Sequence, residues 1–104
     1  MKKLTGRGKV LLDREGQFER GQEVEVGYTY LEGDRIRATL TDLTIDGEAF
    51  PGVWEIYVHG FLVAISKLEV GSAVRWMLST WKPSVVVPED PYRGDPLRRP
   101  PSLA

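Results

Sequence analysis

The sequence predicts an all-β protein, namely a small antiparallel barrel or sandwich of about six strands followed by an extended, proline-rich C-terminal tail. Three observations support this prediction. Apolar and polar residues alternate with a period of two in several segments before residue 83, as they do in strands that bury one face. Stretches rich in glycine and acidic residues separate these segments. Six of the seven prolines lie from residue 83 onward, where each removes a backbone hydrogen-bond donor.

We therefore divide the chain into a β domain over residues 1–82 and a tail over residues 83–104 that is extended or disordered. A chain of 104 residues has room for one hydrophobic core. Within the tail, only residues 85–87 (Val-Val-Val) have the composition of a further short edge strand. The sequence has neither an apolar run long enough to span a membrane nor the apolar stretch of a signal peptide, so we expect a cytoplasmic protein that does not contact membranes.

The first predicted strand covers residues 7–12 and is entered through a bend at Gly6 and Gly8. The second and third cover residues 23–31 and 35–40, which alternate strictly and form a hairpin. Opposed residues share a face of a sheet, so the loop length follows from the pattern. A three-residue loop at residues 32–34, with a bulge, keeps the apolar residues together by pairing Tyr30 with Ile36, Tyr28 with Ala38 and Val26 with Leu40.

A second hairpin is predicted around a two-residue turn at His59-Gly60. This turn gives one continuous apolar face made of Trp54, Ile56, Val58, Phe61, Val63 and Ile65. The other face is also apolar, since it carries Tyr57, Leu62 and Ala64. We therefore expect this hairpin to be buried on both sides or half covered by a neighbouring element.

The last segment of the domain, residues 66–82, fits two structures. Val74, Trp76 and Leu78 alternate as in a strand, but residues 70–81 also show helical spacing with Ser72 as a candidate cap. We favour the strand, because residues 68–72 have the composition of a turn that precedes an extended run. The helix remains the alternative.

Composition excludes several classes of function. The formal charge of −1 argues against capture of nucleic acid by bulk electrostatic attraction, and the absence of cysteine excludes thiolate catalysis and thiolate metal sites. His59 is the single histidine, and its place in a tight turn favours a structural or solvent-exposed role. We therefore expect no enzyme, no cofactor and no metal. The absence of asparagine and the excess of arginine over lysine are compatible with a thermophilic source.

An acidic cluster over residues 42–48 is the best candidate for a hard cation site, although it lacks the spacing of a calcium loop. We expect instead a strand end and a turn whose carboxylates cap backbone amides. The same segment resembles the Asp-x-Ser-x-x-Gly element of PilZ domains, with Asp42, Thr44 and Gly47 at the matching positions. The resemblance implies a cyclic-dinucleotide sensor, but the paired arginines that such domains place upstream are absent.

The leading functional hypothesis is a non-enzymatic interaction module, an accessory subunit, adaptor or inhibitor that docks through its β surface and its tail. The tail contains Pro-x-x-Pro-x-Arg at residues 88–93, a pattern of polyproline ligands. The candidate partner-binding residues are Arg35, Arg37, Thr39, Tyr92, Arg93, Leu97, Arg98 and Arg99. One alternative is a small β-barrel nucleic-acid binder that uses Arg35, Arg37 and the N-terminal lysines, and another is a small-ligand or cyclic-dinucleotide sensor. Edge strands offer a route to oligomers.

Overall fold

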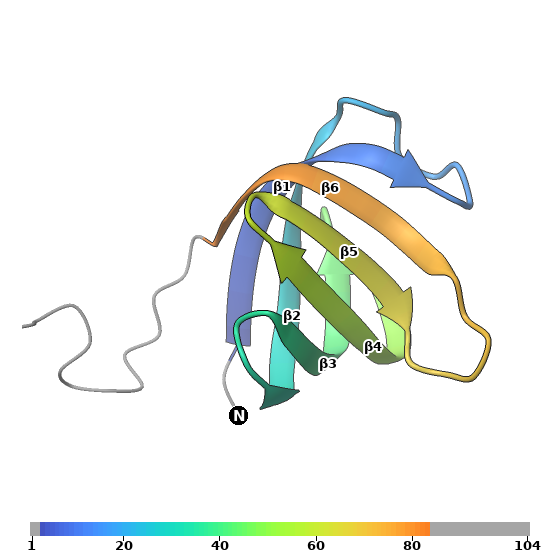
Figure 1. Cartoon of the computed structure of the whole chain (residues 1–104). Coiled ribbons are helices and arrows are strands. Elements are labelled where there is room, and N and C mark those ends of the chain that lie inside the picture. Colours follow the sequence, from blue (N-terminus) through green and yellow to red (C-terminus); the bar gives the residue numbers. More distant parts are fainter. Residues whose placement is uncertain (1–2, 84–104) are drawn as a thin grey trace, which may run out of the picture.

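The computed structural model describes residues 3–83, which form a closed six-stranded antiparallel barrel (Figure 1). Each strand pairs with the next along the chain, and the last pairs with the first. The strands are β1 (Lys3–Asp13), β2 (Glu23–Gly33), β3 (Arg37–Ile45), β4 (Glu48–His59), β5 (Leu62–Lys67) and β6 (Val74–Pro83). The predicted all-β class is confirmed, and of the two predicted architectures the barrel is the one observed.

The interior contains the apolar residues that alternate along the strands, because successive side chains of a strand point to opposite faces. Its largest fully buried members are Trp76, Leu40, Leu43, Ile45, Ile65 and Leu78. Gly6 and Gly8 on β1 allow the ring of Trp81 to approach the backbone, since a Cβ at Gly6 would overlap two of its ring atoms. The two glycines therefore act through packing inside β1, which begins at Lys3, so the predicted start of this strand at residue 7 is wrong.

The ambiguous last segment is a strand, as favoured, and it contributes Trp76, Leu78 and Trp81 to the core. The turn expected at residues 68–72 precedes it. β6 ends at Pro83, the residue at which the tail is predicted to begin. Residues 84–104, which include the predicted edge strand at residues 85–87, lie outside the described residues.

The first hairpin has bulges, as predicted, but its loop is not at residues 32–34: residues 34–36 separate β2 from β3, and the amide of Asp34 donates to the carbonyl of Arg37 at 2.9 Å. Tyr30 therefore pairs with Leu40, Val26 with Ile45 and Ala38 with Gly33. All three predicted pairings of this hairpin are wrong. Asp34 explains the shift, because its Oδ1 accepts the N–H groups of Ile36 and Arg37 at 2.8 and 2.9 Å. Such an aspartate turn closes the loop locally and leaves Ile36 exposed.

The second hairpin has the predicted two-residue turn one position later, at Gly60-Phe61, so that His59 pairs with Leu62. Gly60 has a φ of 63°, whereas Phe61 is not among the residues with positive φ. This combination is typical of a type II′ turn, which requires glycine at its first central position. Phe61 is consequently 72% exposed and does not belong to the apolar face predicted for it, while Ile56 and Val63 lie inside the barrel as expected.

Closure of the barrel gives each described strand a hydrogen-bonded neighbour on both sides. Within residues 3–83, the expected route to oligomers through edge strands therefore has no free edge strand to use. The described residues also contain no helix that is long and apolar enough to cross a membrane.

Candidate interaction surface

An apolar row crosses the outside of four neighbouring strands. Tyr57 on β4 pairs with Ala64 on β5, Ala64 pairs with Met77 on β6, and Met77 pairs with Leu12 on β1. Paired residues share a face, so these side chains lie side by side on the outer surface. Leu62 lies two residues before Ala64 on β5 and is therefore on the same outer face. We call Leu12, Tyr57, Leu62, Ala64 and Met77 the outer strip.

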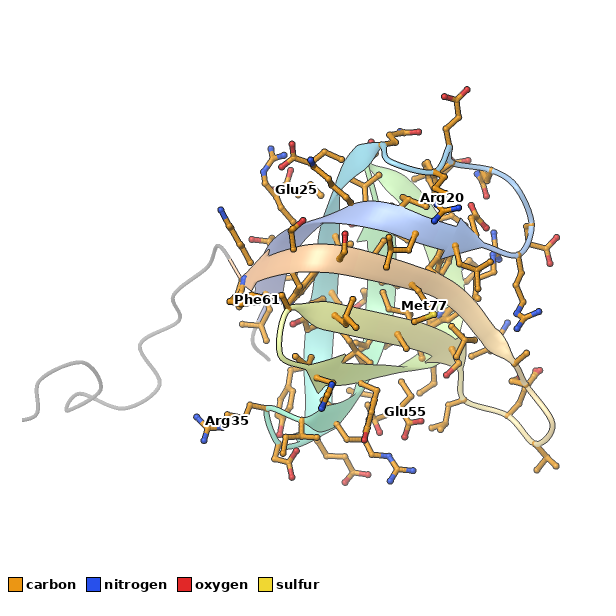
Figure 2. The ribbon with its side chains drawn as sticks, turned by 45° about the horizontal axis from the view of Figure 1, so that its top comes forward. Arg20, Glu25, Arg35, Glu55, Phe61 and Met77 are labelled. Carbon is orange, nitrogen blue, oxygen red and sulfur yellow. The ribbon has the colours of Figure 1, made fainter. Side chains whose placement is uncertain are left out.

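A shallow hollow of about 370 Å³ lies in this strip and is lined by Tyr57, His59, Leu62, Val63, Ala64 and Met77. The small side chain of Ala64 stands between the two larger side chains of Tyr57 and Met77, which gives the hollow its floor and walls. Figure 2 shows Met77 on this face and Phe61 at the tip of the β4–β5 hairpin, beside the end of β6.

The outer strip is exposed or half-buried, whereas Tyr57, Leu62 and Ala64 were expected to be buried or half covered by a neighbouring element. Tyr57 is 49% exposed and Leu62 41%, and no element among residues 3–83 covers them. The expectation was wrong because a six-stranded barrel uses only its inner face for the core, and the described chain has no helix or second sheet to lie over the outside. A contiguous exposed apolar surface is typical of an interaction site.

The predicted binding residues of the domain lie next to this strip. Arg37 pairs with Tyr57 across β3 and β4, and its Nε lies 2.9 Å from Oε2 of Glu55. This hydrogen bond with Glu55 raises the pKa of Arg37. Thr39 pairs with Glu55, whereas Arg35 is exposed in the β2–β3 loop. The predicted tail residues lie outside the described residues, namely Tyr92, Arg93, Leu97, Arg98 and Arg99.

Other described arginines bind acceptors of the protein itself. Arg7 lies 3.9 Å from Glu23, and the Nε of Arg14 donates to the carbonyl of Val74 at 2.6 Å. The Nε of Arg75 lies 3.4 Å from Oδ1 of Asp13. These contacts leave fewer free guanidinium groups for a phosphate backbone than the sequence suggests.

The ion pair of Asp13 and Arg75 links the end of β1 to the beginning of β6. Arg75 lies over the ring of Trp76, with its guanidinium carbon 4.3 Å from the ring centroid. Burial alone would raise the pKa of Asp13, but hydrogen bonds from the amides of Phe18, Glu15 and Gln17 and from Arg75 lower it overall. The cluster fixes the 14–22 loop against β6, and its carboxylate has no exposed surface with which to reach a ligand.

The acidic segment at residues 42–48 forms the β3–β4 connection. Asp46 and Gly47 have φ values of 51° and 84°, which are those of a type I′ turn. Oδ1 of Asp46 accepts the amide N–H of Glu25 at 2.9 Å, so the predicted capping of a backbone amide is confirmed for this residue. Within residues 3–83, no group of three or more acidic or histidine side chains is arranged to hold a metal ion.

Comparison with known proteins identifies no relative of this chain. No family model, no curated protein and no solved structure matches the chain. The resemblance of Asp42, Thr44 and Gly47 to the PilZ element therefore stands without a family match.

Sequence reasoning placed Arg37 and Thr39 on an outer face correctly, but it did not identify the outer strip as a site. The signal was present, since Tyr57, Leu62 and Ala64 form an apolar set on the second face of the β4–β5 hairpin. The inclusion of Met77 and Leu12 depends on pairing between β5, β6 and β1, and that pairing has bulges that the pattern does not show.

Proposed function

We propose that this protein is a non-enzymatic, cytoplasmic interaction module, an adaptor, accessory subunit or inhibitor that binds a protein partner through the outer strip. The uncovered row formed by Tyr57, Ala64, Met77 and Leu12 is the observation on which the proposal rests. Burial of this surface against a partner removes apolar area from water, and that removal is the main favourable term in protein association.

The chemistry of the strip fits a protein interface. Tyrosine, methionine and arginine are enriched at the centre of such interfaces, and here Tyr57, Met77 and Arg37 lie on adjacent strands. Methionine adapts to irregular partner surfaces because its side chain is unbranched. Phe61, at the tip of the same hairpin, offers a further exposed aromatic anchor.

The nucleic-acid alternative has less support. The aromatic residues that would stack bases are mostly buried, since Tyr28 is 9% exposed and Trp54, Trp76 and Trp81 no more than 5%. Stacking requires an open ring face. For such a binder, affinity would fall steeply with salt and on Arg35→Glu or Arg37→Glu.

A matched pair of variants tests the proposal. Ala64→Glu places a charge in the middle of the hollow, whereas Ala49→Glu places the same charge at an exposed site elsewhere on β4. In affinity purification from the native host, we expect Ala64→Glu to lose the partner that the wild type and Ala49→Glu recover. Recovery of the same partner by Ala64→Glu, with the barrel still folded by circular dichroism, would refute the proposed surface.

A further inference from the structure

We propose that the hollow in the outer strip is the docking site of the proline-rich segment 88–97 of the same chain. The inference rests on the proposed function, because the segment would cover the surface to which the partner binds. Docking in cis would make the tail an intramolecular competitor, and its release would present the strip and the proline-rich segment to a partner together.

β6 ends close to the hollow. The amide of Trp81 donates to the carbonyl of Phe61 at 2.9 Å, so the last residues of β6 lie beside the tip of the β4–β5 hairpin. Pro83 is two residues further on, or about 7 Å along an extended chain. Leu62 and His59, which line the near end of the hollow, are the residues that flank this turn. The tail therefore begins next to the site.

The chain beyond Pro83 is long enough to reach and cross the hollow. The five steps from Pro83 to residue 88 span up to about 17 Å, which suffices to reach the near end of the hollow. The apolar row from Tyr57 to Leu12 crosses three strand spacings of about 4.8 Å, or about 14 Å in total. Ten residues in polyproline II geometry extend about 31 Å, so residues 88–97 can cross the whole row.

The hollow and the proline-rich segment are chemically complementary. Proline-rich ligands dock on grooves lined by aromatic and apolar side chains, and Tyr57 provides an exposed ring in this hollow. Residues 88–97 contain Tyr92 and Leu97 as apolar anchors, with acidic and basic residues between the prolines. The ion pair of Arg37 and Glu55 offers one charge of each sign beside Tyr57.

The energetics favour binding in cis. Attachment through a short linker gives the segment an effective concentration of about 1 mM, so an intrinsic dissociation constant of about 1 mM would occupy the hollow in roughly half of the molecules. Prolines reduce the conformational entropy that the segment loses on docking. A weak contact is therefore enough for regulation, and a partner of higher affinity can displace it.

Paramagnetic relaxation enhancement on the full chain tests this docking. The chain contains no cysteine, so Ser102→Cys gives a single attachment site for a nitroxide outside the segment. We expect the amide signals of Tyr57, Ala64 and Met77 to lose intensity strongly, because the docked segment brings the nitroxide near the strip in a large fraction of the molecules. The amides of Thr44 and Ala49, near the β3–β4 turn, serve as controls and should be affected much less.

Two variants separate docking from mere proximity. Tyr92→Ser combined with Leu97→Ser removes the anchors without touching the barrel, and it should abolish the signal loss at the strip. Ala64→Glu should do the same from the other side. Signal loss that persists in the tail variant, or that is confined to the end of β6, would overturn the proposal.

A mixture of isotope-labelled chain without nitroxide and unlabelled chain with nitroxide examines the alternative occupant. Signal loss at the strip in this mixture would show that the tail of a second copy binds there, which also overturns docking in cis. Absence of docking together with partner loss in Ala64→Glu would refute this inference and leave the proposed function intact. Docking of the tail together with undiminished partner recovery by Ala64→Glu would refute the proposed function and leave this inference intact.

Discussion

Replacing Asp13 with asparagine should destabilise the barrel strongly, because its carboxylate is a buried acceptor for four donors. Oδ1 accepts the amide of Glu15 at 3.0 Å and lies 3.4 Å from Nε of Arg75, while Oδ2 accepts the amides of Gln17 and Phe18, both at 2.9 Å. Only 1% of the side chain is exposed. Asparagine keeps one acceptor oxygen and turns an N–H₂ group toward amides that need an acceptor.

The expected loss follows from these contacts. A hydrogen bond to a charged group contributes about 1.5–3 kcal/mol, and removing one partner of a buried ion pair costs about 3–5 kcal/mol. These terms overlap, so we expect Asp13→Asn to lower the free energy of unfolding by about 3 kcal/mol. For a domain of this size, that corresponds to a melting temperature lower by about 10–20 °C.

The effect should depend on pH in a defined direction. The pKa of Asp13 is lowered in the folded state, so its contribution is complete above the unfolded-state pKa of about 3.9 and disappears as the pH falls through the lower folded-state pKa. The stability difference between wild type and Asp13→Asn should therefore be largest near neutral pH and shrink below about pH 4.

Urea denaturation followed by tryptophan fluorescence at several pH values measures this difference. Glu15→Gln is the matched control, since it makes the same change from acid to amide at an exposed position of the same loop. A loss of less than about 0.5 kcal/mol in Asp13→Asn at pH 7 would refute the reasoning, because surface substitutions commonly reach that size. A difference that stays constant down to pH 3 would refute the linkage.

Three further substitutions test the packing, the turn and the surface charges. Gly6→Ala should cost about 1–3 kcal/mol in urea denaturation, because its methyl group would overlap the Trp81 ring. In Gly60→Ala the new Cβ would meet open space, and the φ of 63° is the only source of strain, so the free energy of unfolding should fall by about 1–2 kcal/mol. We expect this loss to be smaller than that of Gly6→Ala; a larger loss in Gly60→Ala would contradict the close packing of Gly6 against Trp81. Arg37→Gln removes an exposed ion pair with Glu55 and should leave the urea midpoint nearly unchanged; a shift as large as that of Gly60→Ala would show that the pair supports the fold.

The turns show how far local pattern can be read. Alternation along β4 and β5 correctly predicted that Ile56 and Val63 face the core, because side chains change face at every residue whatever the register. The alternation could not fix the position of the turn, because moving the turn by one residue shifts the pairing of the strands by two residues and leaves every side chain on the same face. The turn was decided by backbone geometry, with Gly60 in the first central position and Phe61 left in solvent.

The candidate site was likewise visible in the sequence only in part. The residues of the outer strip are apolar in the sequence, but apolar residues on the second face of a hairpin suggested a covering element. Whether Tyr57 and Leu62 are covered depends on what the rest of the chain places over them, and within residues 3–83 all six strands are used to close the barrel. Exposure is therefore a property of the assembled structure.

By itself, the sequence determined the all-β class and most of the inward-facing positions, because these depend on the period and composition of neighbouring residues. The tertiary structure alone decided that the sheet closes, that its register brings Tyr57, Ala64, Met77 and Leu12 into one row, and that no element within residues 3–83 covers this row. The physical reason is that closure and register follow from hydrogen bonds between strands distant in sequence, including β1 with β6, and no local pattern encodes those pairings.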